Sequence, residues 1–437
     1  MISIRTALIY KLAIGLAALS TSAFAQKSTC SVFNANLKTT YTSLQTGVNA
    51  GRPGDTLLVS GICVGFTEIH QSLVITGLNV KGSGTGTLDG LGTGRVVTVN
   101  AGVVAVLNNI IITRGAADQG AGIYNSGTLT LNNTTVTGNT ASSLGGALFN
   151  NGGVVLLNDS RLTQNSGLAG GAIATRDGSL TISGMSSIDG NTGSQGAGGI
   201  AAKGTNISLN GKSAVSGNIA PAAAGVDLRE GGSLTLNGYS SIRKNIATGD
   251  FVGGAVFVLN TLVTMNEQSG IIGNLSECSG AGLAAQTSIV TMTGSSSIKQ
   301  NVATTRGGGG VANLGGTFTM NGKSAISGNK AGSVGGGILN EFGGIVLMNE
   351  SSSISTNTAG LVGGGVYNSN SAANGFFGPG AALTMTGKSV ISGNIATNGG
   401  GIFNANYLTS SGISNNAVAG VNVIANSPND IVTATPP

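Results

Sequence analysis

Apolar residues recur along this chain at fixed distances from a repeated asparagine. In nine successive units, the residue three before the asparagine is aliphatic, and the residues nine and eleven before it are apolar. The first unit has Leu156 and Val154 at the latter two positions, and a later unit has Met348 and Val346. These units are 26 to 29 residues long, apart from a last one of 37. The repeated asparagine, with one further copy upstream, stands at Asn139, Asn165, Asn191, Asn218, Asn245, Asn274, Asn301, Asn329, Asn357 and Asn394.

Each unit predicts three short strands. The apolar residues nine and eleven before the asparagine are two positions apart, so they share one face of a strand. A second strand surrounds the aliphatic residue three before the asparagine, and a third follows a glycine pair such as Gly336-Gly337. Units of this length and composition stack into solenoids, in which each strand pairs with its equivalent in the next coil. We therefore predict an all-β chain: a right-handed parallel β-helix of about a dozen coils.

The asparagine and the glycine pair are expected to form the corners of each coil. Asparagine tolerates the left-handed backbone region better than most residues, and stacked asparagines can form an amide hydrogen-bond ladder. Glycine suits a corner that needs a positive φ or a close approach between backbones. Both features therefore have a structural explanation.

The two ends of the chain lack this repeat. Residues 1–25 resemble a Sec signal peptide, with Arg5 and Lys11 ahead of an apolar stretch and a small-residue cleavage site at residues 23–25. Residues 26–55 are predicted to cap the solenoid, with a short amphipathic helix at residues 41–48. The β-helix is predicted over residues 56–425, with a surface loop around residues 370–382, and a polar tail over 426–437.

Composition narrows the range of functions. Charged residues are only 8% of the chain and glycine accounts for 76 of 437 residues, so the pI near 9.2 reflects scarce charge and not a basic surface. No cluster of lysine and arginine with interleaved aromatics is present, which argues against nucleic-acid binding. Cys30 and Cys63 predict a disulfide in an exported protein. Cys278 is either a small buried residue or a reactive thiol.

The coils resemble those of bacterial right-handed parallel β-helix proteins of the pectin-lyase-like superfamily. The repeats are also similar to the passenger repeats of chlamydial polymorphic outer-membrane proteins, which are adhesins, although we expect no C-terminal membrane barrel of the kind found in those proteins. The likeness covers roughly residues 50–415 and predicts the fold more strongly than an activity. It rests on Pro53-Gly54-Asp55-Thr56, Leu73-Val74-Ile75-Thr76-Gly77, Leu88-Asp89-Gly90, Ile326-Ser327-Gly328-Asn329, Gly335-Gly336-Gly337-Ile338-Leu339-Asn340 and Leu383-Thr384-Met385-Thr386-Gly387.

The resemblance implies what an enzyme of this fold would need. Lyases require a carboxylate cluster that holds Ca²⁺ together with an Arg or Lys base, and hydrolases require two or three close aspartates. The sequence has no Asp-Asp pair and only one histidine, His70. We therefore predict no catalytic residues, no metal site and no cofactor, with Ca²⁺ required only if the chain is a lyase.

A row of charged residues is one candidate binding site. Arg176, Lys203 and Arg229 are 27 and 26 residues apart, so they should stack on adjacent coils, and Asp177 and Glu230 follow the two arginines. This row is either a solvated corner with partial charge pairing or a surface that grips an acidic glycan. If the chain were a lyase or hydrolase, Arg176, Asp177, Asp227 and Arg229 would be the best catalytic candidates.

A regular polar face is the second candidate. Outward positions between the two apolar columns carry threonine or serine in most coils, and asparagine often follows two residues later, as in Thr235, Asn237, Thr264 and Asn266. Val155 and Leu347 are predicted to interrupt the hydroxyl row. The face is either a tolerated polar surface or a flat binding face for a glycan or for ice.

These observations favour a secreted or surface-associated adhesin-like protein that binds without catalysis. Its expected partner is an extracellular polysaccharide or a cell-surface component, with no nucleic acid and no transmembrane anchor in the mature chain. The alternative is a polysaccharide lyase or glycoside hydrolase whose carboxylates converge from different coils.

Overall fold

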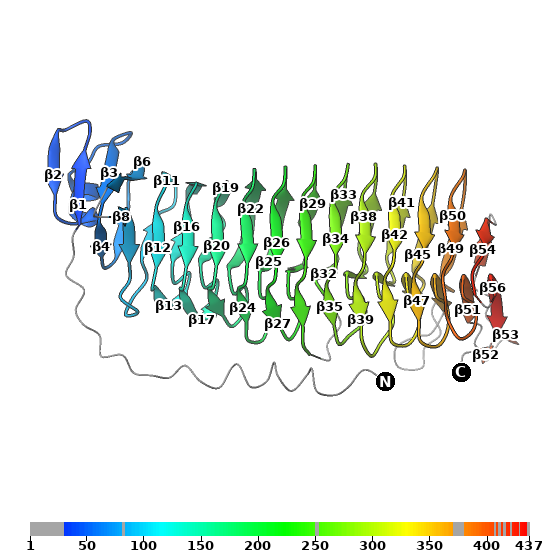
Figure 1. The fold of residues 1–437 in the computed structure, drawn as a ribbon. Helices are drawn as coiled ribbons and strands as arrows, with labels where there is room; N and C mark the ends of the chain where they lie inside the picture. The colour runs from blue at the N-terminus through cyan, green and yellow to red at the C-terminus, as the bar shows by residue number, and fades with distance from the viewer. Residues whose placement is uncertain are drawn as a thin grey trace.

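The computed structural model is a nearly all-β chain wound into a parallel solenoid of about 12 turns (Figure 1). The predicted fold class is confirmed. The structure describes residues 30–80, 84–249, 253–369, 380–405, 408–409, 412–413, 417–419, 422–427 and 429–434. The predicted signal peptide and residues 370–379 of the predicted surface loop lie outside these ranges.

A typical coil contains four strands where the sequence predicted three. In one coil these are β18 (Leu148–Asn151), β19 (Val154–Asn158), β20 (Arg161–Thr163) and β21 (Ser166–Gly167). The fourth strand directly follows the repeated asparagine. It is only two residues long, too short to leave an alternating apolar pattern in the sequence.

The strands of successive coils align into three long sheets. The first combines two strands of each coil and has 28 described strands: β1 (Ser31–Asn34), β2 (Thr39–Tyr41), β3 (Thr56–Ser60), β5 (Thr67–Ile69), β6 (Leu73–Gly77), β10 (Val97–Val99), β11 (Val104–Asn108), β14 (Ile123–Asn125), β15 (Thr128–Asn132), β18, β19, β22 (Ile173–Ser183), β25 (Ile200–Leu209), β28 (Val226–Arg229), β29 (Ser233–Leu236), β32 (Val256–Leu259), β33 (Leu262–Met265), β36 (Leu283–Gln286), β37 (Ile289–Met292), β40 (Val311–Leu314), β41 (Thr317–Met320), β44 (Ile338–Glu341), β45 (Ile345–Met348), β48 (Val366–Ser369), β49 (Ala382–Met385), β51 (Ile402–Ala405), β54 (Ala417–Ala419) and β56 (Ile431–Ala434).

The other two sheets take one strand from each coil that contributes to them. The second has 14 described strands: β4 (Ile62–Val64), β9 (Thr87–Asp89), β12 (Ile111–Thr113), β16 (Thr135–Thr137), β20, β23 (Ser187–Asp189), β26 (Ala214–Ser216), β30 (Ser241–Arg243), β34 (Gly270–Ile272), β38 (Ser297–Lys299), β42 (Ala325–Ser327), β46 (Ser353–Ser355), β50 (Val390–Ser392) and β55 (Val423–Ile424). The third has 10 described strands: β13 (Ala116–Gln119), β17 (Thr140–Leu144), β21, β24 (Thr192–Gly193), β27 (Ile219–Ala220), β31 (Ile246–Ala247), β35 (Leu275–Ser276), β39 (Val302–Ala303), β43 (Lys330–Ala331) and β47 (Thr358–Ala359). Short antiparallel pairs join β7 (Asn79–Val80) to β8 (Gly84–Thr85) and β52 (Leu408–Thr409) to β53 (Gly412–Ile413).

Equivalent residues stack on one another inside the solenoid. Met265 of β33, for example, pairs in register with Met292 of β37, and both side chains are completely buried. Such columns exclude water with small aliphatic contacts repeated in every coil.

The predicted register is wrong by one residue in one coil. The buried residues of β19 are Val155 and Leu157, whereas Val154 and Leu156 were expected to face inward. The turn after this strand, residues 158–160, is one residue shorter than the equivalent turn at residues 183–186. Because side chains alternate along a strand, counting back across the shorter turn placed the wrong residues inside.

The predicted asparagine ladder is present and runs from Asn139 to Asn426. At each step the side-chain amide donates to the side-chain oxygen of the next asparagine at 2.9–3.0 Å. The backbone N–H of each asparagine donates to that same oxygen at 2.9–3.1 Å. This inner ladder therefore satisfies polar groups that would be costly to bury alone.

The left-handed backbone predicted at the asparagine lies one residue earlier. Gln300 (φ 58°) precedes Asn301, and Gly328 (φ 63°) precedes Asn329, whereas no ladder asparagine has a positive φ. Because the residue before the asparagine makes the left-handed turn, the asparagine side chain points inward and reaches its neighbour. The position was misassigned because a buried amide and a left-handed corner both favour asparagine.

The glycine-rich corner needs glycine for two different reasons. Gly335 adopts a φ of +62°, which residues with a Cβ avoid. At Gly337, by contrast, a Cβ would lie 2.6 Å from the backbone oxygen of Gly365 in the next coil. Both predicted functions of glycine are thus present, at neighbouring positions.

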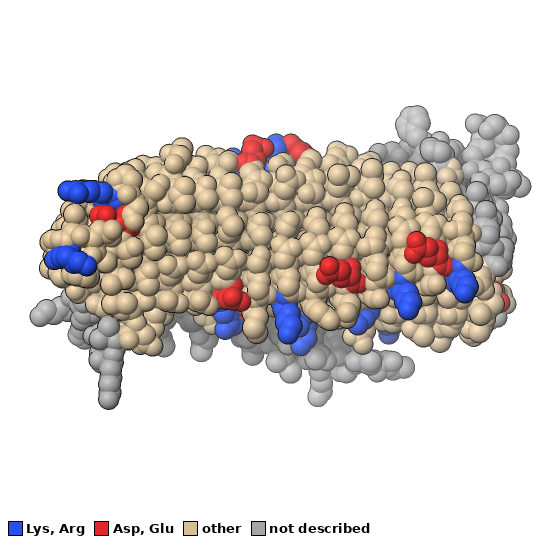
Figure 2. Space-filling view, turned by 90° about the horizontal axis from the view of Figure 1, so that it is seen from above, with Lys and Arg blue, Asp and Glu red and all other residues tan. Residues whose placement is uncertain are grey.

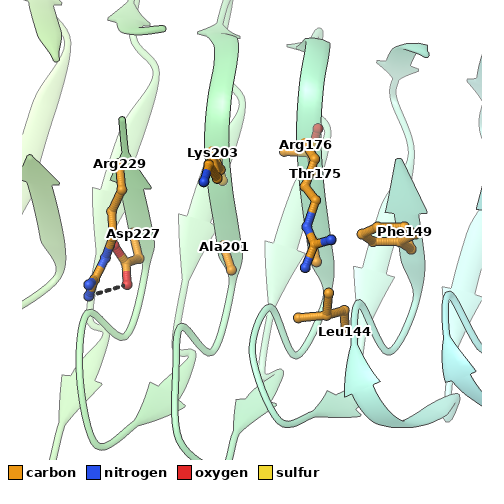
Figure 3. Close-up of a pocket in the computed structure, with 10 residues that line it drawn as sticks. Leu144, Phe149, Thr175, Arg176, Ala201, Lys203, Asp227 and Arg229 are labelled. Atoms are coloured by element: carbon orange, nitrogen blue, oxygen red, sulfur yellow. Dashed lines mark hydrogen bonds and ion pairs between the residues drawn. The ribbon is translucent and has the colours of Figure 1, made fainter. Parts of the chain in front are cut away.

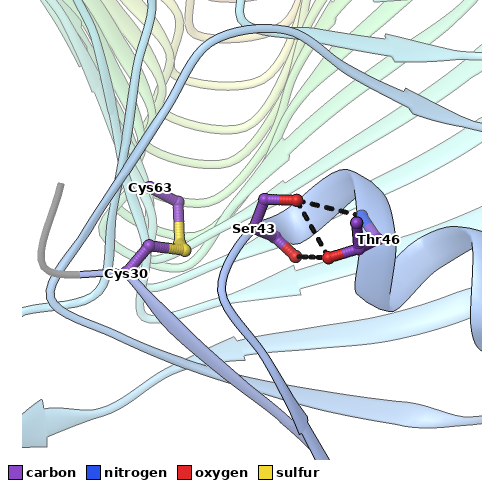
Figure 4. Close-up of a disulfide and its surroundings, with 4 residues drawn as sticks. All are labelled: Cys30, Ser43, Thr46 and Cys63. Atoms are coloured by element: carbon purple, nitrogen blue, oxygen red, sulfur yellow. Dashed lines mark hydrogen bonds between the residues drawn. A yellow bond between two sulfur atoms is a disulfide. The ribbon is translucent and has the colours of Figure 1, made fainter.

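The N-terminal end is closed by a small cap. Helix α2 (Leu44–Ala50) begins at Ser43, whose hydroxyl accepts a hydrogen bond from the backbone N–H of Thr46 (Figure 4). The helix buries Leu44 and Val48. Its bounds are close to the predicted 41–48. Cys30 and Cys63 form a disulfide beside it (Figure 4).

A buried carboxylate also stabilises this cap. Asp55 accepts hydrogen bonds from the side chain of Asn34 at 2.8 Å and from the backbone N–H of Arg52 at 3.0 Å. The bond from Asn34, supported by the bond from Arg52, lowers the pKa of Asp55 below its usual value.

At the other end the solenoid continues through the segment predicted as a polar tail. Strand β56 pairs in parallel with β51, and Asn426 receives the last described step of the inner ladder. Across the described residues, no helix has the length and apolar character needed to cross a membrane.

Candidate functional site

Arg176, Lys203 and Arg229 lie side by side on three successive coils, on β22, β25 and β28 (Figure 3). The sheet register pairs Arg176 with Lys203 and Lys203 with Arg229, as the spacing predicted. Because neighbouring strands are about 4.8 Å apart, three cationic side chains originate within about 10 Å along the axis. We call these three residues the basic row.

Arg229 pairs with Asp227 and not with its sequence neighbour Glu230. Its Nε and Nη2 donate to the two carboxylate oxygens of Asp227 at 2.8 and 3.0 Å. Residues 227 and 229 share one face of β28, whereas Glu230 occupies the corner with a φ of 58°. Glu230 instead lies 2.5 Å from the Nζ of Lys203. The hydrogen bonds with Asp227 raise the pKa of Arg229, and burial opposes this effect.

Arg176 is the remaining cation of the row. Among the described residues it forms no ion pair. Its predicted partner Asp177 occupies a corner with a φ of 46° and forms no ion pair with it. The Arg176 guanidinium lies 5.8 Å from the ring centre of Phe149, much as that of Arg229 lies 4.9 Å from the ring of Phe257. Both rings thus help to hold the guanidinium groups in place.

A pocket of about 190 Å³, open to solvent, lies along the basic row (Figure 3). Among its lining residues three are basic and one is acidic, and Glu230 neutralises Lys203 from outside the lining, so three cations and two carboxylates leave a local net charge of +1. The rest of the lining is mostly apolar. The lining consists of Leu144, Phe149, Ala174, Thr175, Arg176, Ala201, Ala202, Lys203, Asp227 and Arg229.

Two small side chains, those of Ala174 and Ala201, leave room for the pocket. Ala174 and Ala201 belong to an outward-facing column that holds aromatic or leucine side chains in many other coils. The space that a larger side chain would fill is therefore left open between Phe149 and Asp227. In register, the column consists of Tyr124, Phe149, Ala174, Ala201, Asp227, Phe257, Ala284, Ala312, Leu339, Tyr367 and Phe403.

The sequence interpretation missed this pocket wall. Leu144, Phe149 and the two alanines carry no charge or motif that would single them out. If the coils had been aligned on the glycine pair, the outward column would have shown the change from phenylalanine to alanine.

The predicted polar face is present, but its amides are already paired with one another. Thr235 and Thr264 stack in register on β29 and β33. The amide of Asn266 donates to Asn237 at 2.8 Å, and Oδ1 of Asn266 accepts from the hydroxyl of Thr293 at 2.9 Å. This outer ladder stabilises the surface and leaves fewer amide groups available to a ligand.

Two details of this face differ from the prediction. Leu156, which pairs in register with Thr181, interrupts the hydroxyl row where Val155 was expected to do so. The predicted interruption at Leu347 is present. Exposed aliphatic side chains, which the pattern did not reveal, flank the row at Leu262 and Ile289.

Charge is distributed unevenly around this face. Figure 2 shows the face on which β19, β29, β33 and β41 lie, seen from above the view of Figure 1. The charges of the central coils are confined to the two long borders of this face. The polar face is thus an almost uncharged surface. The basic row is the stronger candidate site because it combines net charge with a pocket.

Within the described residues, no group of three His, Cys, Asp or Glu side chains is placed to hold a metal ion. Comparison of the chain with models of known families, with curated proteins and with solved structures gave no match.

Proposed function

We propose that this protein is a secreted or surface-associated solenoid that binds a glycan of the extracellular space or of a cell surface without cleaving it. The observation that supports this function is the basic row, held in register over a pocket in which Arg176 leaves a net charge of +1. Sugar polymers suit such a surface because a long chain can follow the solenoid axis, and because arginines bind carboxylates through paired hydrogen bonds.

The geometry of the row favours binding. Arg229 is fixed by Asp227 and the ring of Phe257, so little side-chain entropy remains to be lost when a ligand binds. The Asp227 carboxylate is engaged by that arginine. We also propose descent from the pectin-lyase-like β-helix proteins and export by a signal peptide, on the sequence features given above.

The test is retention of the mature chain on a panel of acidic and neutral polysaccharides, with and without Ca²⁺. We expect retention on acidic polymers, lost in the double variant Arg176→Ala/Arg229→Ala and kept in Arg243→Ala, which removes an exposed arginine of another sheet. New reducing or unsaturated chain ends that disappear in Asp227→Ala would instead make the protein a polysaccharide-degrading enzyme. Absence of retention on every polymer would refute glycan binding.

A further inference from the structure

We propose that the pocket along the basic row binds an acidic sugar that carries an N-acetyl group, with the carboxylate on Arg176 and the acetyl methyl against Ala201. This inference rests on the proposed glycan binding and specifies its ligand. Three features of the pocket carry it, and each matches one part of such a sugar.

The first feature is the guanidinium of Arg176. It is the member of the basic row that forms no ion pair among the described residues, whereas Arg229 and Lys203 each have a carboxylate partner. Phe149 holds it through its ring face, which leaves the edge of the guanidinium and its N–H donors available. A planar fork of donors matches a carboxylate.

The second feature is the apolar lining. Leu144, Phe149, Ala174 and Ala201 surround the space that the two alanines leave open. The hydroxyl that an unsubstituted uronic acid has in place of the N-acetyl group would be desolvated against this lining without a partner, which is unfavourable. An acetyl methyl group fits the same lining and removes apolar surface from water.

The third feature is the carboxylate of Asp227. It lies in the pocket lining and is 8% exposed, and each of its oxygens accepts one hydrogen bond from Arg229. Since an ionised carboxylate has about four acceptor sites, it can still accept the amide N–H of an N-acetyl group. Asp227 lies two coils from Arg176, about 10 Å along the axis, so one substituted sugar can lie between them.

The pocket is too small and too open to enclose a whole sugar, so it holds the N-acetyl group and the carboxylate while the sugar ring lies across its mouth. Its volume of about 190 Å³ is below the roughly 300–1,000 Å³ of pockets for drug-sized molecules. The rest of a polymer would therefore lie at the surface, above the pocket that Lys203 and Arg229 help to line.

The test compares three probes on the full mature chain by titration calorimetry. Poly-N-acetylneuraminate has both a carboxylate and an N-acetyl group, polygalacturonate has only the carboxylate, and chitin oligosaccharides have only the N-acetyl group. We expect the first to bind at least about tenfold more tightly than either of the others. Equal or tighter binding of polygalacturonate would overturn this inference and leave glycan binding intact, whereas no binding of any probe would contradict both.

Two variants test the assigned contacts. Arg176→Gln should weaken binding of poly-N-acetylneuraminate by about 10- to 100-fold, since a charged hydrogen bond is lost, while the matched Arg243→Gln should not change it. Ala201→Phe fills the pocket with the residue found at the same column position in Phe149 and Phe257 and should abolish the preference for the N-acetylated polymer. If this variant fails to fold by circular dichroism, Ala201→Leu replaces it. Retained preference in the folded variant would refute the pocket.

Discussion

Removal of a single asparagine from the inner ladder should destabilise the solenoid far more than removal of one from the outer ladder. The variant Asn301→Ala deletes a completely buried amide that takes part in four hydrogen bonds. The backbone N–H and the side-chain amide of Asn274 each lose an acceptor, and the carbonyl of Ile271 loses its amide donor. Three buried groups at about 1–3 kcal/mol each give a loss of at least about 3 kcal/mol.

The assay is guanidinium-induced unfolding followed by far-UV circular dichroism, with Asn321→Ala as the matched control. Asn321 belongs to the outer ladder, where its side-chain oxygen accepts a hydrogen bond from Asn349 at 2.9 Å near the surface. Water can replace that partner, so the control should lose no more than about 1 kcal/mol. If both variants lose the same small free energy, the inner ladder is not a major source of stability and the reasoning fails.

Three further predictions concern the cap, acid stability and the glycine corner. Cys63→Ser should lower the free energy of unfolding by about 2–4 kcal/mol, measured as the shift in the denaturation midpoint. Asp55, whose folded-state pKa is lowered chiefly by the hydrogen bond from Asn34, contributes its full stabilisation above its unfolded pKa of about 3.9 and loses it as pH falls through the folded value. The melting temperature of Asp55→Asn should therefore fall less between pH 5 and pH 2 than that of the native chain, and an equal fall would contradict the assignment. Gly337→Ala should cost about 1–3 kcal/mol through steric clash, whereas Gly328→Asn, at a positive φ with open space around it, should cost less than about 1 kcal/mol; equal thermal shifts would contradict this.

Much of the fold could be predicted because each coil repeats the same solution. Columns such as Met265 and Met292 are visible in the sequence, since stacked positions must suit one environment. The misplacement of Val155 shows the limit: one residue fewer in a turn inverts the faces of a strand, and no single coil reveals that change.

The candidate site was harder to predict than the fold. The basic row follows from spacing alone, but the partner of Arg229 depends on which residues share a strand face. The pocket depends on the smallness of Ala174 and Ala201 relative to coils on either side. A missing side chain leaves no motif, so this feature became apparent only from the packing.

The inner ladder also has a direction. From Asn139 onward, every described bond between ladder side chains is donated toward the C-terminal end, while the same amide also donates to a backbone carbonyl of the preceding coil. The side-chain dipoles of the ladder therefore add along the axis, as peptide dipoles do in an α-helix. At Asn426 both the side-chain amide and the backbone N–H donate to the carboxylate of Asp430. An ionised aspartate accepts hydrogen bonds but donates none. The anionic side chain of Asp430 therefore neutralises the electropositive terminus of the ladder. The chain of amide hydrogen bonds ends there, because Asp430 has no donor for a further step.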